Sequence, residues 1–465
     1  LRWTYAFECH RKKVNELIRI LWSETGVKTP MDPTMDIPPM FIVPERFQKV
    51  GELFRTRYWF PFFYFIILLG FVFYFIIADF SPLSVWMAIA ALVFASILGV
   101  RWYFSLRKVE NVVRVVIEGC NGEWSQEHYL PFLVKKAEKG DIELWAIDIK
   151  PRIQWSNHSI AKLWRSAQSK GKVCYLNKNQ DKEYPEKLPN ADFVFITAPD
   201  RYHCKIAEFW LERLSSSGRI FIEKPLDASV EQANEFKEKL GEHDAVYGFD
   251  HYLATAQPFL KDKVKYLKKI GEIKEIEFYI LEHLCIPPNK KNTLKEGMIF
   301  DLFCHILALV GVVVDQNLTQ PKIKEVKAAR YRRSPISRET FASIKFFIDG
   351  TKITSAVGKC VGKAEDKVMI ILGSKGKIKL DFHENKFSVL DIYGGQSKEG
   401  KLEPSHVESF LEAILRQRDP RSVPGVLSFD TDLEILKVLD EAKKKIGKML
   451  QYSCKESIDE ILRKF

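Results

Sequence analysis

The sequence predicts an α/β domain on a doubly wound parallel sheet, then an α+β domain with a mostly antiparallel sheet, with a two-helix transmembrane anchor ahead of both. Two uncharged runs, 58–78 and 80–100, are each long enough to cross a bilayer as a helix. Strands and helices alternate over 110–247, which is typical of a parallel sheet. Over 248–446 the pattern changes to paired strands with short turns, which favours antiparallel pairing.

The composition is that of a folded chain with two or three domains. Of 465 residues, 46% are apolar and 28% charged, which excludes a disordered chain and a many-spanning membrane protein. We interpret the net charge of +11 as a basic solvated surface plus charges near a membrane, although an anionic lipid or substrate would also suit it. No nucleic-acid-binding motif occurs, so we expect no nucleic-acid partner.

The two uncharged runs predict an anchor with a defined orientation. Residues 1–57 are expected to form a cytoplasmic segment and residues 58–104 a helical hairpin. Basic residues flank both outer ends of the hairpin: Arg46, Lys49, Arg55, Arg57, Arg101, Arg107 and Lys108. Because Lys and Arg are retained on the cytoplasmic side, we expect a membrane location with both termini and the catalytic domains in the cytoplasm.

The cysteines give no sign of a metal site. All eight are spaced singly, without a CxxC pair and without histidines at zinc-binding spacing. We therefore expect reduced thiols in a reducing compartment and no bound metal.

A candidate dinucleotide turn follows the first strand of the α/β domain, 112–117. A dinucleotide site needs a tight turn and bare backbone at a helix start, which Gly119, Cys120, Asn121 and Gly122 could supply. Asn121 and Trp124 replace the middle and last glycines of the usual GxGxxG pattern, so an ordinary strand-to-helix turn remains an alternative.

The end of the second strand, 142–147, carries the signal for cofactor preference. Asp148 stands where an acid accepts hydrogen bonds from the adenosine ribose, which favours NAD. Lys150 and Arg152 follow closely and could bind the extra phosphate of NADP. We expect NAD or NADP, with a preference for NAD.

Further strands and helices complete the two domains. In the α/β domain we expect strands at 193–197 and 219–222. The α+β domain, 248–446, should contain strands at 273–281, 323–333, 341–348, 351–357, 368–372 and 377–381 and helices at 261–270, 299–313, 405–416 and 431–446. Asp349-Gly350 predicts a two-residue hairpin turn, and 447–465 is expected to be a tail.

Three motifs in the predicted domains combine into one pattern. A strand ends in Thr197-Ala198-Pro199, with His203 four residues after Pro199, and the next strand ends in Glu223-Lys224-Pro225. Gly297 then leads a predicted helix with Asp301 and His305 four residues apart, on one face of an apolar helix. With the entry into the second domain near Asp250 and the closing helix near 407–414, this pattern resembles the Gfo/Idh/MocA family of sugar and polyol oxidoreductases over about 110–443.

The resemblance implies a Rossmann domain and hydride transfer between nicotinamide and a hydroxyl or carbonyl carbon of a sugar, sugar derivative or cyclitol. Lys224 would polarise the reacting oxygen, His305 would be the general acid or base, and Asp301 would orient substrate hydroxyls or the imidazole. Asp250 and His251 would line the substrate pocket. The expected cofactor contacts are Gly119, Cys120, Asn121, Gly122, Asp148, Lys150, Thr197, Pro199, His203, Glu223, Lys224 and Pro225. A homo-oligomer through the outer face of the antiparallel sheet is also implied.

Two other readings remain open. The run Asp250-His251-Tyr252-Leu253 also resembles the start of the substrate motif of glucose-6-phosphate dehydrogenases, but Ala254-Thr255-Ala256 stand where those enzymes continue with Gly-Lys-Glu. The irregular glycine turn would also suit a catalytically inactive, dinucleotide-sensing or scaffolding protein at the membrane.

Overall fold

The computed structural model describes residues 112–465, apart from 156, 181–187, 189, 288–293, 315–320, 363–364, 392–394, 405, 417–418 and 454–455. The predicted cytoplasmic segment, 1–57, and the predicted hairpin, 58–104, lie outside the described residues. Among the described residues, none of the helices combines the length and the apolar character needed to span a bilayer.

A seven-stranded sheet forms the core of the first domain, in the order β15-β6-β5-β4-β1-β2-β3. Six strands are parallel, and the short β15 pairs antiparallel with β6. The strands are β1 (Val113–Glu118), β2 (Ile142–Asp148), β3 (Val173–Asn177), β4 (Ala191–Ile196), β5 (Leu214–Glu223), β6 (Val246–Phe249) and β15 (Val426–Ser428). The predicted doubly wound α/β sheet is confirmed, with its order reversing between β1 and β4.

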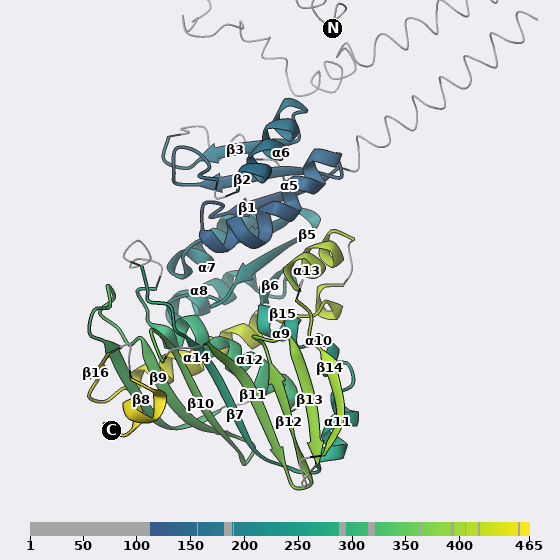
Figure 1. Ribbon diagram of the computed structural model, residues 1–465. Coiled ribbons are helices and arrows are strands. Elements are labelled where there is room, and N and C mark those ends of the chain that lie inside the picture. Colours follow the sequence, from purple (N-terminus) through teal and green to yellow (C-terminus); the bar gives the residue numbers. More distant parts are fainter. Residues whose placement is uncertain are drawn as a thin grey trace, which may run out of the picture. The chain divides into compact units, whose positions relative to one another are not determined.

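Helices cover both faces of this sheet (Figure 1). They are the π-helical turn η1 (Ser125–Tyr129), α5 (Leu130–Lys139), α6 (His158–Ser169), the 3-10 turn η2 (Asp200–Tyr202), α7 (His203–Leu211) and α8 (Val230–Leu240). Two of these helices begin at side-chain caps, Asn157 on α6 and Ser229 on α8, which accept backbone N–H groups that have no partner within the helix.

The second domain is built on a nine-stranded sheet, in the order β14-β13-β12-β11-β7-β10-β9-β8-β16. β10 with β7 and β16 with β8 are parallel pairs, and the other pairs are antiparallel. The strands are β7 (Ile273–Glu282), β8 (Lys322–Tyr331), β9 (Phe341–Ile348), β10 (Thr351–Lys359), β11 (Asp366–Gly373), β12 (Gly376–Asp381), β13 (Lys386–Asp391), β14 (Gln396–Lys401) and β16 (Leu450–Tyr452). The mostly antiparallel sheet is therefore confirmed, including the hairpin at Asp349 and Gly350, whose φ angles are both positive.

The remaining helices join the two sheets through a shared hydrophobic core. They are α9 (His251–Thr255), α10 (Gln257–Leu260), α11 (Lys263–Ile270), the π-helical turn η4 (Ile299–Phe303), α12 (Cys304–Val313), α13 (His406–Leu415), the 3-10 turn η5 (Pro420–Ser422), α14 (Phe429–Lys444) and α15 (Ile458–Leu462). α14 contacts α8, α12, β6 and β8. Hydrophobic residues of both sheets therefore belong to one buried cluster.

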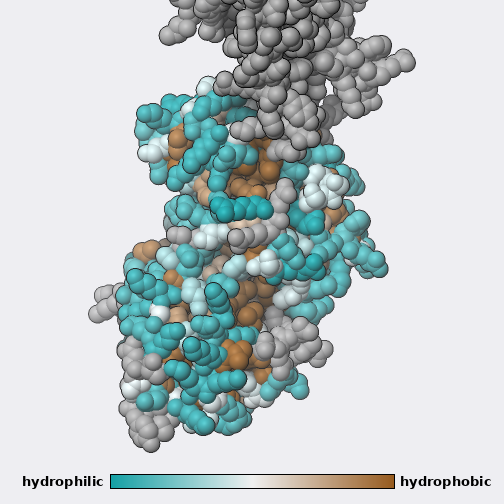
Figure 2. All heavy atoms as spheres, turned by 90° about the vertical axis from the view of Figure 1, so that its right-hand side faces the viewer, coloured by the Kyte–Doolittle hydropathy of each residue, from teal (hydrophilic) through white to brown (hydrophobic). Residues whose placement is uncertain are grey.

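The C-terminal part of the chain returns to the first domain. β15 extends the parallel sheet, and Phe410 of α13 stacks on Phe249 with ring centroids 4.0 Å apart. The face shown in Figure 2 is mostly hydrophilic, with hydrophobic side chains showing in patches between the polar ones. The two domains therefore share sequence segments as well as a core, because a piece of the predicted second domain completes the first.

Candidate active site

The turn after β1 packs directly against the turn after β4. Gly119 has a φ angle of +83°, and a Cβ built on it would lie 2.6 Å from the backbone N and Cα of Ala198. Thr197 Oγ1 donates to the Glu118 carbonyl oxygen at 2.8 Å and closes the same contact. Glycine is thus required at position 119 both by conformation and by the close approach of a second backbone.

Asn121 occupies the place of the middle glycine and binds the turn to the segment after β2. Its backbone N–H donates to Asp148 Oδ2 at 2.9 Å, and its side-chain Oδ1 accepts from the Gln154 N–H at 2.7 Å. Asp148 Oδ1 accepts from the Lys150 N–H at 3.1 Å. Asp148 therefore lies beside the glycine turn at the carboxyl end of β2, as the sequence predicted.

Trp124, in the place of the last glycine, connects the glycine turn to the turn after β5. Its indole N–H donates to Glu223 Oε1 at 2.9 Å, and the Tyr129 hydroxyl donates to the same oxygen at 2.5 Å. Burial raises the pKa of Glu223, against the effect of these two hydrogen bonds. No sequence motif pointed to this link, because tryptophan breaks the expected glycine pattern.

His203 connects the turn after β4 with the turn after β5. Its Nδ1 lies 2.9 Å from the Pro225 carbonyl oxygen and its Nε2 lies 2.6 Å from the Ala198 carbonyl oxygen. The side chain is 1% exposed, and the Lys224–Pro225 peptide bond is cis. Both ring nitrogens therefore contact backbone, while Pro199 and Pro225 belong to the turns that the imidazole holds together.

Lys224 pairs with Asp301. The Lys224 ammonium donates to the Asp301 carbonyl oxygen at 2.6 Å and to its Oδ1 at 3.1 Å. Burial alone would lower the pKa of Lys224, but the acidic groups around it, Asp301 first and then Glu223, together outweigh burial and the pKa is raised. Burial likewise opposes ionisation of Asp301, yet Lys224 and Lys359, 3.5 Å from Oδ2, hold its pKa below the ordinary value. Lys224 is thus a hydrogen-bond donor at neutral pH, not a base.

His305 pairs with Asp250. Its Nδ1 lies 2.6 Å from Asp250 Oδ2, and Asp250 Oδ1 accepts from the Leu253 N–H at 2.8 Å. Both side chains are buried, at 0% and 1% exposed. Burial lowers the pKa of His305 and the Asp250 charge opposes that effect. Since Asp301 contacts Lys224, the residue that orients the imidazole is Asp250.

The local helix geometry explains the separate partners of Asp301 and His305. Asp301 lies in the π-helical turn η4 and His305 is the second residue of α12. One wide turn breaks the 3.6-residue repeat between them. Gly297 precedes this turn at a φ angle of +92°, and the Glu339 carboxylate accepts from the Ile299 N–H at 3.1 Å. The predicted helix over 299–313 is confirmed, with a π-helical turn over its first five residues.

The comparisons with known proteins agree with this geometry. Residues 113–251 match the model of the Gfo/Idh/MocA oxidoreductase family, described as having an NAD-binding Rossmann fold. Residues 113–251 are therefore similar to the nucleotide-binding domain of that family. None of the curated proteins compared with the chain matches it.

Solved structures resemble the fold of both domains at low sequence identity. UDP-N-acetylglucosamine 3-dehydrogenase from Acidithiobacillus ferrooxidans matches with a TM-score of 0.51 and 17% identity over 72% of this chain and 97% of its own. Levoglucosan dehydrogenase, in complex with NADH and levoglucosan, matches with a TM-score of 0.55 and 14% sequence identity. The match covers 72% of this chain and 97% of the levoglucosan dehydrogenase chain. Glucose-6-phosphate 1-dehydrogenase from Mycobacterium avium matches with a TM-score of 0.55 and 14% sequence identity. The match covers 74% of this chain and 94% of that enzyme's chain. At these identities the likeness concerns the fold.

Together, the Gfo/Idh/MocA match and these dehydrogenase neighbours support an NAD(P)-dependent dehydrogenase. The neighbours do not decide between the two cofactors. NADH is present in the levoglucosan dehydrogenase structure, and NADP is present in a 3-ketoreductase from Actinomadura kijaniata.

Several residues near the Lys224 and His305 pairs belong to no sequence motif. Lys359 ends β10 and Glu282 ends β7, where their side chains pair at 3.2 Å. Asp432 of α14 lies against Gly248, where a Cβ would come within 2.0 Å of Asp432 Oδ2. Each of these contacts joins residues far apart in the sequence, so periodicity and spacing could not indicate them.

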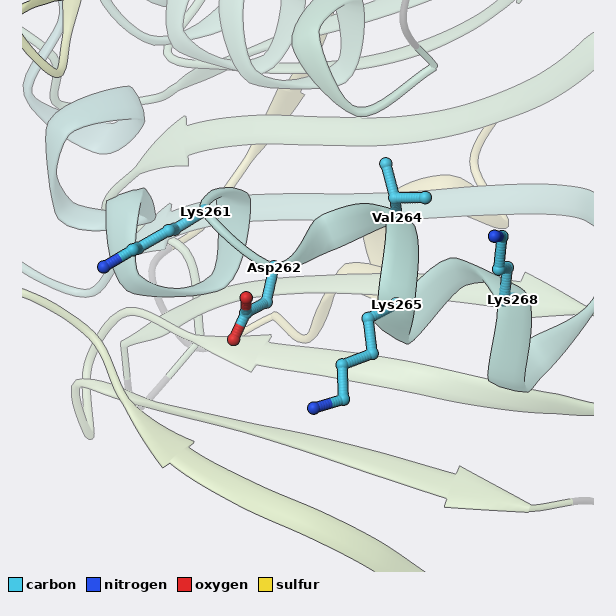
Figure 3. Close-up of a pocket in the computed structure, with 5 residues that line it drawn as sticks. All are labelled: Lys261, Asp262, Val264, Lys265 and Lys268. Carbon is cyan, nitrogen blue, oxygen red and sulfur yellow. The ribbon is translucent and has the colours of Figure 1, made fainter.

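A metal centre and a surface pocket were the other candidates for a functional site. Within the residues the structure describes, no group of three His, Cys, Asp or Glu side chains could hold a metal ion. A surface pocket on α11 is lined by Lys261, Asp262, Val264, Lys265 and Lys268 (Figure 3). None of its lining residues belongs to the Lys224 or His305 pairs, so the pocket is not the catalytic site.

Proposed function

We propose that the chain transfers a hydride between NAD(P) and a hydroxyl or carbonyl carbon of a sugar, sugar derivative or cyclitol. The observation that carries this proposal is that a lysine held in its charged form and a histidine able to exchange a proton lie in the same site. Lys224 is held as an ammonium by Asp301, and His305 is held by Asp250 with its Nε2 left free of any hydrogen bond among the described residues. One group donates a hydrogen bond, and the other can take and return a proton.

The residues around the glycine turn fit a dinucleotide. Gly119 and Gly122 leave the turn bare, and Gly122 is exposed at the start of η1. We expect Asp148 to accept hydrogen bonds from the adenosine ribose. The Lys150 ammonium donates to Gln154 at 2.9 Å, which supports NAD over NADP. The proposed cofactor contacts are Gly119, Cys120, Asn121, Gly122, Asp148, Lys150, Thr197, Pro199 and Lys224, with His203, Glu223 and Pro225 supporting them. The bound cofactor supplies the hydride acceptor or donor.

The chain's own residues handle charge and the proton. In oxidation, Lys224 donates a hydrogen bond to the substrate oxygen as negative charge develops there, and His305 Nε2 accepts the hydroxyl proton. In reduction, His305 returns that proton. Asp301 keeps Lys224 charged, Asp250 fixes the orientation of the imidazole, and His251 lies next to His305 at the substrate side.

Cofactor titration followed by a substrate panel tests the proposal. We expect saturable quenching of tryptophan fluorescence by NADH or NADPH in the full chain, because Trp124 lies between the glycine turn and Glu223. Turnover should then appear on a panel of polyols, hexoses, nucleotide sugars and glucose 6-phosphate. Replacing His305 with Ala should lower kcat by about 100-fold or more while cofactor binding persists, and Lys224→Ala should lower kcat similarly and also weaken cofactor binding.

The inactive scaffold remains the competing function. Asn121 favours it, because its side chain crosses from the glycine turn to Gln154 where a glycine would leave space. It predicts dinucleotide binding without turnover on any member of the panel, or no binding at all. Turnover by the unaltered chain would eliminate it.

We also propose that the enzyme is anchored in a membrane by residues 58–104, with its catalytic domains in the cytoplasm. The two uncharged runs and the basic residues on both outer flanks support this. The full chain should stay in the membrane fraction through an alkaline carbonate wash and leave it in detergent. Extraction by the wash alone would contradict the anchor.

A further inference from the structure

Three histidine rings lie in a row that begins at His305. The His251 ring centroid is 4.2 Å from that of His305, and the His406 ring centroid is 5.6 Å from that of His251. They come from three different elements, α12, α9 and α13. His305 is fully buried, whereas His251 and His406 are half-buried. The row therefore leads from the buried base to His406, a partly exposed side chain whose two ring nitrogens are buried.

Several ring nitrogens along this row have no partner of good hydrogen-bond geometry, although backbone groups of Glu403 and Pro404 interact with His406. His305 Nε2, His251 Nδ1 and both nitrogens of His406 are buried without a hydrogen bond of good geometry to any described residue. A buried polar nitrogen without a partner costs free energy, so such groups call for an explanation. His203 provides the contrast, because both of its ring nitrogens contact backbone carbonyls.

Each histidine of the row has charged or titratable side chains around it, and these come from several different elements. Asp250, Lys224 and Asp301 face His305, and His128 of η1 faces both His251 and His406. Burial, then the neighbouring His305 and Lys224, lowers the pKa of His251 well below its ordinary value. Burial, then His128, lowers the pKa of His406 to about 4, against the opposing effect of the Asp250 carboxylate and nearby backbone groups. An imidazole with a lowered pKa is neutral at neutral pH, so it gives up an accepted proton readily.

We propose that His251 and His406 relay a proton between His305 and solvent. The inference rests on the proposed function. Oxidation of one alcohol carbon gives one hydride to the cofactor and one hydroxyl proton to His305, and that proton must leave before the next turnover. It passes from His305 Nε2 to His251 and then to His406, and from the buried His406 nitrogens through a bridging water to solvent. His251 and His406 are thus positioning residues, not catalytic ones.

The test uses the full chain and the panel sugar that it oxidises fastest. In His251→Asn and His406→Asn we expect kcat for oxidation to fall by about tenfold or more, with KM and NADH affinity unchanged. Added imidazole should restore much of the lost rate, and the rate should become more sensitive to D2O. His243→Asn, an exposed histidine between α8 and β6, is the matched control and should keep the kcat of the unaltered chain.

The outcomes separate the relay from the proposed function. No turnover by the unaltered chain overturns the proposed function and the relay with it. Turnover with unchanged kcat in both variants overturns the relay alone. A rise in KM without a fall in kcat also overturns it and makes His251 a substrate contact. A fall in kcat that imidazole does not restore indicates a packing role instead.

Discussion

At the scale of single residues, the site depends on which carboxylate contacts which cation. Asp301 holds the charge of Lys224, and Asp250 holds the imidazole of His305. The sequence motif placed Asp301 and His305 together and left two roles open for Asp301. The structure separates these roles, because Lys224 and His305 each pair with a different carboxylate. This division lets one site contain a permanent cation and a proton acceptor side by side.

Asp250→Asn tests the division directly. The Asp250 carboxylate opposes the burial that lowers the pKa of His305, so removing its charge should lower that pKa further. In oxidation the base must be neutral, so the acid limb of kcat/KM should move to lower pH. A weaker and less oriented base should also reduce the rate, by about 100-fold. Asp459→Asn, an exposed acid on α15, should leave both unchanged. An unshifted acid limb would contradict the Asp250 assignment.

At the scale of elements, the glycine turn after β1 shows how a strand end becomes a binding surface. Gly119 combines a positive φ angle with a backbone neighbour at 2.6 Å, so two separate constraints exclude a side chain. Gly140, at the end of α5, has a similar φ angle of +85° but nothing within 4 Å of a built Cβ. Both glycines therefore have a left-handed backbone conformation, but only Gly119 also has a close backbone neighbour, so the two effects can be measured separately.

Alanine substitutions at these two glycines should differ in a measurable way. Gly140→Ala should cost about 1 kcal/mol of unfolding free energy from the left-handed conformation and leave NADH affinity unchanged. Gly119→Ala should in addition push the turn away from Ala198 and weaken NADH binding about tenfold or more. Thermal unfolding and fluorescence titration of both variants check this. Equal effects on affinity would show that the close contact with Ala198 does not matter.

The elements also show how far sequence patterns reach. Strand–helix alternation, apolar runs and the Asp349-Gly350 turn predicted both sheets, because each depends on neighbours along the chain. The wide turn at Ile299–Phe303 could not be predicted, since its first backbone N–H is bound by Glu339, which lies in the segment before β9 and is distant in the sequence. The Asp250–His305, Trp124–Glu223 and Lys359–Asp301 contacts were missed for the same reason: each joins segments whose proximity is set by the fold.

At the scale of the whole described molecule, α14 brings a buried acid to the interface between the two domains. Burial, followed by the charges of Asp250 and Glu223, raises the pKa of Asp432 to about 7. An unfolded aspartate has a pKa of about 3.9, so between about pH 4 and 7 the folded chain binds a proton that the unfolded chain has released. The stability of the domain pair should therefore fall as pH rises through this window.

Asp432→Asn should remove that pH dependence. We expect the variant to gain stability over the unaltered chain, and to gain about 1–3 kcal/mol more at pH 8 than at pH 5, at 1.36 kcal/mol per pKa unit. Thermal unfolding at the two pH values measures this. Asp430→Asn, an exposed acid on the same helix, is the control and should show little difference between them. A gain that is equal at both pH values would mean that Asp432 is not held protonated.

The return of α13 and β15 to the first domain has a consequence for biosynthesis. Phe249 is stacked by Phe410, and β6 gains its outer neighbour from Val426–Ser428. A ribosome must therefore translate nearly the whole second domain before the nucleotide-binding domain can close its core. Nascent chains released before residue 428 should expose aromatic surface and depend on chaperones, although every strand of the parallel part of that sheet has already been made.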